Sequence, residues 1–136
     1  MKLFFLKTFI LLSVFWLSLM PVHAQKLVFA EKEHNFGDVY DGDILNYSFY
    51  FTNTSDIPAI VSKVTQSCGC VLSLYPRQPI LKGDTVLITL KFNTNGKKGK
   101  QTKRIEVYSN DPRSPGKLTL KANVLPRSER KKKNTN

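Results

Sequence analysis

Two cysteines separated by a single glycine, in Ser67-Cys68-Gly69-Cys70, form the one chemically unusual cluster of this sequence. In a regular strand, an offset of two residues places both side chains on the same face, with Cβ atoms farther apart than the roughly 3.5–4.5 Å that a disulfide requires. A bond between them therefore needs a turn, which Gly69 could supply. A ring of about three residues stabilises a fold by only on the order of 1.5 kcal/mol. A purely structural staple is the weakest explanation of the pair.

Four interpretations of Cys68 and Cys70 stay open. They are two small reduced side chains at a strand end, a labile intramolecular or intermolecular disulfide, a metal site, or a catalytic dithiol. A metal site is short of ligands, because His34 is the only histidine after residue 24 and a closed zinc site usually takes four Cys or His ligands. Two thiolates suit Cu(I), or an ion shared between two chains. The thioredoxin-type C-x-x-C motif is absent, which disfavours a redox enzyme.

No other group of residues matches a catalytic constellation. The sequence has no G-x-S-x-G motif and no recognisable pair of catalytic carboxylates. His34 precedes Asn35-Phe36-Gly37, and we expect it in a strand or bend as a partly exposed structural side chain. The sequence therefore predicts no enzyme, no catalytic residue and no cofactor.

Residues 1–24 have the layout of a secretory signal peptide, with two lysines near the start and an apolar stretch from Phe9 to Met20. Small side chains before the junction predict cleavage between Ala24 and Gln25. An uncleaved anchor is the second interpretation, but an apolar run of about a dozen residues is short against the roughly 20 that span a bilayer. The expected location is periplasmic or secreted, where thiols tend to be oxidised.

The charge is strongly positive and unevenly distributed. The 136 residues contain 21 Lys+Arg and 10 Asp+Glu, a net charge of +11, which falls to +9 when the two lysines of residues 1–24 are removed. Residues 127–136 contain no apolar side chain and are expected to be a disordered basic tail. Six of the acids lie in residues 27–60, whereas residues 61–136 carry 17 bases. Export argues against nucleic acid as a partner.

The middle of the chain alternates apolar and polar residues, which is typical of strands buried on one face. The alternation is clearest over residues 45–51, 86–92 and 118–124, with shorter candidates at 27–29, 60–65, 71–75 and 105–107. Gly, Asn, Asp and Pro separate these runs and indicate turns. About seven strands in about 100 residues predict one domain over residues 25–126, an all-β immunoglobulin-like antiparallel sandwich.

A basic segment lies between two of the expected strands, from Phe92 to Ile105. Its cations are Lys97, Lys98, Lys100, Lys103 and Arg104. One interpretation is a solvated hairpin tip whose lysines discourage edge pairing. The other is a basic finger that contacts an anionic partner, such as lipid headgroups at a membrane surface, an envelope polysaccharide or an acidic protein surface. Contact between acidic and basic faces of neighbouring copies, in a homo-oligomer, is a further arrangement.

Several motifs, taken in order along the chain, resemble the bacterial domain-of-unknown-function family 1573. The matching stretches are His34-Asn-Phe-Gly-Asp-Val39, Phe49-Tyr-Phe-Thr-Asn53, Ser67-Cys-Gly-Cys70, Leu81-Lys-Gly-Asp84 and Asn110-Asp111. The resemblance implies an exported immunoglobulin-like sandwich similar to ASH and major-sperm-protein domains, and it supplies no activity. The chain has Val71 where the family usually places Thr, and Lys82 where it usually places Pro.

Two functions are consistent with these observations. The first is a non-enzymatic binding or structural module of the cell envelope, whose edge strands accept a strand of an envelope protein and whose cations contact an anionic envelope polymer. The second is a thiol or metal protein in which Cys68 and Cys70 bind Cu(I) or Zn(II) or exchange disulfides. In addition, Asp84-Thr85-Val86 resembles a bacterial O-glycosylation acceptor, which points to Thr85 as a modification site.

Overall fold

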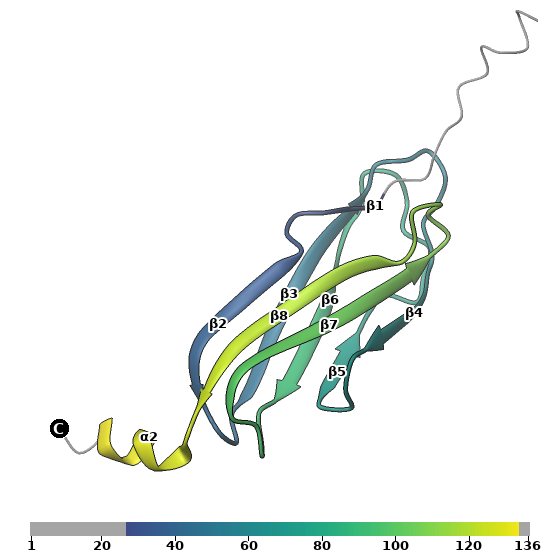
Figure 1. Cartoon of the computed structure of the whole chain (residues 1–136). Helices are drawn as coiled ribbons and strands as arrows, with labels where there is room; N and C mark the ends of the chain where they lie inside the picture. The colour runs from purple at the N-terminus through teal and green to yellow at the C-terminus, as the bar shows by residue number, and fades with distance from the viewer. Residues whose placement is uncertain (1–26, 134–136) are drawn as a thin grey trace, which may run out of the picture.

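Eight strands arranged in two facing sheets make up most of the computed structural model, which describes residues 27–133 (Figure 1). The strands are β1 (Leu27–Phe29), β2 (Glu33–Tyr40), β3 (Ile44–Asn53), β4 (Val61–Gln66), β5 (Val71–Leu74), β6 (Thr85–Asn93), β7 (Gly99–Ser109) and β8 (Gly116–Leu125). We call the sheet with strand order β1-β3-β6-β5 sheet A and the sheet with order β2-β8-β7-β4 sheet B. This architecture confirms the predicted all-β immunoglobulin-like sandwich. The expected signal peptide, residues 1–24, and the junction at Ala24–Gln25 lie outside the described residues.

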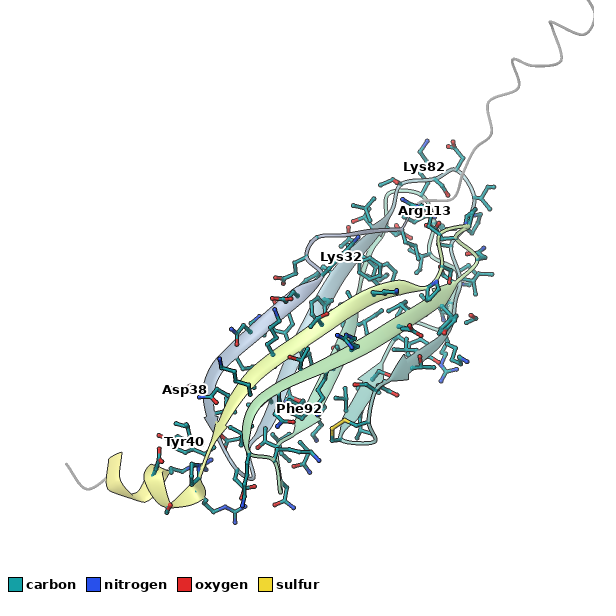
Figure 2. The ribbon with its side chains drawn as sticks, viewed as in Figure 1. Lys32, Asp38, Tyr40, Lys82, Phe92 and Arg113 are labelled. Atoms are coloured by element: carbon teal, nitrogen blue, oxygen red, sulfur yellow. A yellow bond between two sulfur atoms is a disulfide. The ribbon has the colours of Figure 1, made fainter. Side chains whose placement is uncertain are left out.

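The core lies between the sheets and is formed by alternate residues of the central strands. In sheet A, Phe49 is paired with Ile88 and Phe51 with Val86, so large side chains from adjacent strands meet on the inner face. The phenyl ring of Phe92 lies in the same interior (Figure 2). Each such side chain stabilises the fold by about 1.5–3 kcal/mol when it is fully buried. The period-two pattern of the sequence therefore correctly identified the inner face.

Strand β2 was not among the seven strands expected from the alternation, although His34 was expected in a strand or bend. It pairs in parallel with β8, and the register shifts between Asn35 and Asp38. Gly37, between them, has a φ of 69°, which is a left-handed conformation that favours glycine. This irregularity interrupts the alternation on which strand prediction depends, and a parallel pair is not expected in a purely antiparallel sandwich.

The predicted hairpin between Phe92 and Ile105 is wrong. Strand β6 belongs to sheet A and β7 to sheet B, so residues 94–98 cross from one sheet to the other. Thr94 holds this crossing in place. Its hydroxyl group lies within donating distance of two carbonyl oxygens, that of Tyr40 at 2.8 Å and that of Asp43 at 2.9 Å. The basic segment is therefore a connection between the two sheets, and the fully buried Thr94 anchors it to the β2–β3 turn.

The predicted disordered tail is also wrong for residues 127–133, which form the helix α2 (Arg127–Lys133). The parallel β2–β8 pair ends with Tyr40 beside Leu125, and this brings the tail next to the acidic Asp41-Gly42-Asp43 turn. Arg130 forms an ion pair with Asp43, and its guanidinium lies 4.9 Å from the ring centroid of Tyr40. The carboxylate of Asp43 and the ring of Tyr40 thus hold a segment that has no apolar side chain of its own to bury.

A buried carboxylate joins the two sheets at the opposite end of the molecule, where Figure 2 places Arg113. Asp111 accepts hydrogen bonds from the backbone N–H of Leu27 at 2.8 Å and from the guanidinium of Arg113 at 2.8 Å. Burial alone would raise the pKa of Asp111, but the hydrogen bonds from Arg113 and Leu27 and the positive charge of Arg113 outweigh it, and the pKa lies below its usual value. The ionised form of Asp111 is therefore the one that fastens β1 to the β7–β8 turn.

No helix in the part of the chain from residue 27 to 133 is long and apolar enough to cross a membrane.

We predict that Asp111→Asn lowers the free energy of unfolding by about 1–3 kcal/mol near neutral pH, because it weakens charge-assisted hydrogen bonds to a buried group. A depressed pKa stabilises the fold above the unfolded-state value of about 3.9, and this contribution disappears as the pH falls through the lower folded-state pKa. Urea unfolding followed by circular dichroism at neutral and acidic pH measures both effects. The variant should lose less stability on acidification than the wild type. The control Asp38→Asn alters an exposed carboxylate and should cost less than about 0.5 kcal/mol.

Candidate functional site

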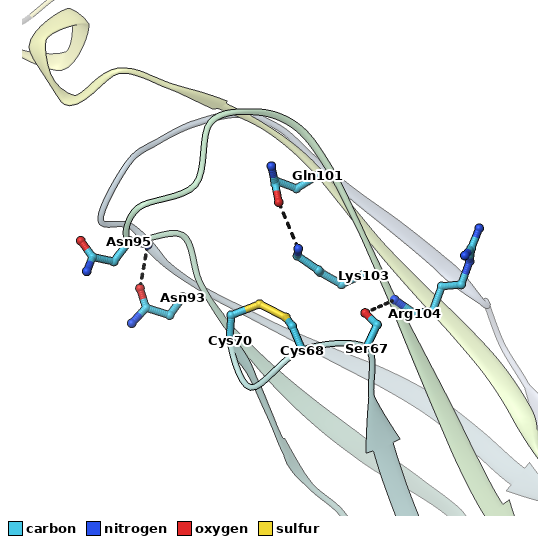
Figure 3. The surroundings of a disulfide bond; sticks show 8 residues. All are labelled: Ser67, Cys68, Cys70, Asn93, Asn95, Gln101, Lys103 and Arg104. Atoms are coloured by element: carbon cyan, nitrogen blue, oxygen red, sulfur yellow. Dashed lines mark hydrogen bonds between the residues drawn. A yellow bond between two sulfur atoms is a disulfide. The ribbon is translucent and has the colours of Figure 1, made fainter.

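The two cysteines lie in the turn that connects β4 of sheet B with β5 of sheet A (Figure 3). Cys68 and Cys70 form a disulfide, with their Cα atoms 5.3 Å apart. This separation is within the range of ordinary disulfides, because the chain leaves the extended conformation after Gln66. Gly69 does not have a positive φ, and a Cβ atom built on it meets nothing within 4 Å. The turn therefore does not need a glycine, contrary to what the sequence suggested.

Main-chain hydrogen bonds hold the turn on both sides. The N–H of Asn93 in sheet A donates to the carbonyl oxygen of Cys70 at 2.9 Å. In sheet B, the N–H of Ser67 donates to the carbonyl oxygen of Arg104 at 3.0 Å, and the N–H of Arg104 donates to the Ser67 hydroxyl at 3.2 Å. The disulfide is thus carried by a backbone whose position is set by both neighbouring strands, and both cysteines are half-buried against the core.

Lys103 lies on the inner face of β7 at the same end of the sandwich (Figure 3). Its ammonium group donates to the side-chain oxygen of Gln101 at 3.0 Å and lies 5.6 Å from the ring centroid of Phe92. Burial, and secondarily the nearby charge of Lys97, lower the pKa of Lys103 below its usual value. A lysine directed into the end of an apolar core is a position that the sequence alone did not distinguish from its exposed neighbours.

The structure divides the predicted basic cluster into two groups. Lys97 and Lys103 are half-buried and close enough for their charges to interact. Lys98, Lys100 and Arg104 are exposed, and the last two project from the outer face of sheet B, because they alternate with the inward residues of β7. The five cations therefore do not form one finger, although all of them lie towards the disulfide end of the molecule.

Residues 27–133 contain no group of three or more His, Cys, Asp or Glu side chains that could hold a metal ion. While their sulfurs are bonded to each other, Cys68 and Cys70 offer no thiolate, so a metal-bound form would require the reduced pair. His34 lies on β2, away from the sulfurs in the strand order, and its ring stacks on Tyr47 with centroids 3.5 Å apart. The structure thus gives His34 a packing role within an aromatic cluster.

The outer face of sheet A has an apolar surface that the sequence reasoning missed. Its exposed large hydrophobic side chains, which we call the outer strip, are Val28, Ile44, Tyr50, Leu72, Leu74 and Leu87. Leu72 and Leu74 are 63% and 74% exposed, although both belong to a strand. The alternation in the sequence could have revealed these residues, because in each strand of sheet A they lie between the residues that face the core.

Two hollows lie along the outer strip. One, of about 490 Å³, is lined by Tyr50, Leu74, Tyr75, Pro76 and Leu87 together with Thr85 and Val86. The other, of about 370 Å³, reaches the disulfide, and we call it the Cys70 groove. Its lining includes Ile44, Cys70, Leu72, Lys91, Asn93 and Asn95. The site is therefore a disulfide placed at one end of a sheet face on which exposed apolar side chains lie among polar ones.

Residues 27–124 match the family model described as protein of unknown function (DUF1573). The chain belongs to this family. A comparison with curated proteins finds no match. The expected resemblance is therefore confirmed, and membership brings no established activity.

Solved structures with a similar fold come from unrelated settings. A protein of unknown function from Porphyromonas gingivalis W83 is 17% identical with a TM-score of 0.65, covering 78% of this chain and 50% of that one. The ASH/PapD-like domain 7 of human CEP192 is 7% identical with a TM-score of 0.63, covering 79% of this chain and 91% of that domain. The VesB protease of Vibrio cholerae is 13% identical with a TM-score of 0.54, covering 80% of this chain and 33% of the protease. At these identities the likeness concerns the fold alone. The chain spans only half and one third of the two longer proteins.

We predict that replacing both cysteines, in Cys68→Ser/Cys70→Ser, lowers the free energy of unfolding by no more than about 1.5 kcal/mol, because so short a ring restricts the unfolded chain very little. Chemical unfolding of the non-reduced wild type and the double variant, followed by circular dichroism, provides the comparison. The control Phe92→Ala should cost about 3–5 kcal/mol. A loss in the double variant as large as that of the control would show that the disulfide is a structural staple.

Proposed function

We propose that this chain is an exported, non-enzymatic module of the bacterial cell envelope that binds an extended segment of a partner protein on the outer face of sheet A. The observation that carries the proposal is the contrast between the two outer faces. Among the residues that the structure describes, six of the nine exposed large hydrophobic side chains belong to the outer strip. The outer face of sheet B instead presents polar and charged residues, including Lys100, Arg104, Lys117 and Lys121. Large exposed apolar patches on soluble domains mark interaction sites.

The edge of sheet A beside the outer strip is suited to receive a strand. β5 is the terminal strand of sheet A and has only four residues. Because Asn93 bonds to Cys70 in the antiparallel pair, the main-chain groups of Leu72 and Leu74 are directed to β6 and those of Ser73 are directed away from it. Addition of a strand at such an edge combines main-chain hydrogen bonds with pockets for alternate side chains. The two hollows along the outer strip would supply such pockets.

Charge would contribute a second, non-specific contact. Lys98, Lys100 and Arg104 are exposed near the disulfide end. Several acids are already paired within the chain, for example Glu33 with Lys121 and Asp111 with Arg113. The unpaired positive surplus supports attraction to an anionic envelope polymer or membrane surface. This attraction is screened by salt, whereas contact with the outer strip is not.

We predict that Leu74→Asp/Leu87→Asp abolishes retention of a partner protein that the wild-type chain retains from envelope extracts at high salt. A charged side chain placed in an apolar contact must be desolvated without a partner. The control Thr102→Asp/Thr119→Asp adds the same charge to the outer face of sheet B and should keep the partner. Sedimentation of the purified chain tests whether the strip instead joins two copies. Equal retention by the two variants, or none by the wild type at low or high salt, would contradict the proposal.

Export has its own test. We predict that the exported protein begins at Gln25, so that its intact mass corresponds to residues 25–136. Ala24→Leu should prevent this cleavage, because signal peptidase requires a small side chain at that position, and an uncleaved mass from the wild type would contradict the interpretation. The same spectrum tests modification of Thr85, whose exposed hydroxyl lies 2.7 Å from that of Thr52.

A further inference from the structure

We propose that the Cys68–Cys70 disulfide exchanges with a pair of thiols on a partner polypeptide, with the sulfur of Cys70 as the atom attacked and Lys103 as the residue that stabilises the departing thiolate of Cys68. The identity of the partner as a polypeptide rests on the proposed function. The exchange itself rests on four features of the disulfide end: access, the nearby cation, the short ring and the independent anchoring of the turn.

Access to the disulfide comes from the sheet A side. Cys70 lines the Cys70 groove, and the walls on either side of it are apolar at Ile44 and Leu72 and polar at Asn93 and Asn95. At about 3.3 Å per residue, the distance along β5 from Cys70 to Leu74 is about 13 Å. An extended partner segment of about five residues on the outer strip would therefore reach from the hollow beside Leu74 to the sulfur of Cys70. Both cysteines are half-buried, and Cys70 is the one of the two that lines this groove.

A cation lies in the surroundings of the disulfide (Figure 3). The β4–β7 register pairs Gln66 with Ile105, and the hydrogen bonds between Ser67 and Arg104 continue it by one residue, to the point where the chain leaves the strand. Lys103 precedes Arg104 on β7, and its ammonium group lies over the ring of Phe92, the residue that pairs with Val71 next to Cys70. A nearby lysine favours the thiolate over the thiol, and a stable thiolate leaves faster in exchange.

Opening the bond would not require the domain to unfold. The main-chain bonds from Asn93 to Cys70 and between Ser67 and Arg104 do not involve sulfur, so they hold the turn in either redox state. The side chain of Gln66 also donates to the hydroxyl of Ser73 across the turn at 2.9 Å. A ring closed over so few residues gives the disulfide little entropic protection against reduction. The pair is therefore arranged to change redox state on an intact scaffold.

The reaction balances in two steps. A thiolate of the partner attacks the sulfur of Cys70, the S–S bond breaks, and Cys68 leaves as a thiolate while a mixed disulfide forms on Cys70. The second thiolate of the partner then attacks the partner's first sulfur in that mixed disulfide. This step forms a disulfide within the partner and releases Cys70 as a thiolate. The partner dithiol loses two electrons and two protons and becomes a disulfide. Cys68 and Cys70 gain the two electrons and, after protonation, become thiols.

The first test measures reduction of the purified, non-reduced chain by dithiothreitol, with alkylation and intact mass at each time point. We expect complete reduction in about 1 mM dithiothreitol while the strand signal in circular dichroism is unchanged. Lys103→Met should slow reduction roughly threefold to tenfold, and the control Lys100→Met, on the outer face of the same strand, should leave the rate unchanged. A disulfide that resists reduction until the protein unfolds would overturn the proposal. Equal rates for the two lysine variants would overturn the role of Lys103.

The second test separates the two sulfurs. The non-reduced chain is treated with a short peptide that carries one thiol, the free cysteine is alkylated at once, and peptide mapping by mass spectrometry should locate the mixed disulfide on Cys70 and the alkyl group on Cys68. In Cys70→Ser, Lys103→Met should shift alkylation of Cys68 by iodoacetamide to higher pH, a change that loss of packing alone does not cause. A peptide adduct found mainly on Cys68 would overturn the assignment of Cys70. These probes do not need the outer strip. The exchange proposal can therefore be contradicted without contradicting the proposal of partner binding, and partner binding can be contradicted without contradicting the exchange.

Discussion

The packing of two sheets through alternate side chains is the constraint on which the other features of this domain depend. Phe49, Phe51 and Phe92 are almost completely buried, and with the intervening aliphatic residues they fix which parity of each strand faces inward. A strand cannot turn one residue inward without turning its neighbours outward. The position of Leu87 on the surface is therefore set by the burial of Ile88, and the same relation holds for Leu72 beside Val71. The outer strip consists of residues that the core could not accommodate, and its apolar character needs an explanation outside the core.

The same packing explains why lysine and arginine side chains lie around the disulfide (Figure 3). The chain crosses between the sheets three times at the disulfide end, through the β2–β3 turn, the Cys68–Cys70 turn and residues 94–98. Some inward-facing positions of β7 at this end, Gln101 and Lys103, are only half-buried. An inward lysine is tolerated at such a position because its stem covers Phe92 while its amine reaches Gln101. The disulfide and the half-buried lysine therefore lie at the same end because the chain passes from one sheet to the other there.

The unequal charge of the chain acquires a structural meaning in the same way. Acids concentrated in the first third of the described residues are matched with bases from distant segments: Asp43 with Arg130, and Glu33 with Lys121. The parallel pairing of β2 with β8 brings these segments together. Such exposed pairs contribute little stability individually. Their effect is to neutralise the acidic edge within the molecule, and to leave Lys98, Lys100 and Arg104 as a positive surface near the disulfide.

Local pattern was sufficient to predict much of this protein from its sequence, because burial on one face of a strand leaves a period of two. The strands around Phe49, Leu90 and Leu120 were predicted correctly for this reason. Strand β2 escaped prediction because the irregularity at Gly37 breaks the period, and α2 did because its partners lie more than eighty residues away, at Asp43. The special character of Cys68 and Cys70 was also evident from residue type and spacing. Their bond, the groove beside Cys70 and the inward lysine depend on which strands become neighbours, and pairing between distant segments is set by the three-dimensional packing of the whole chain.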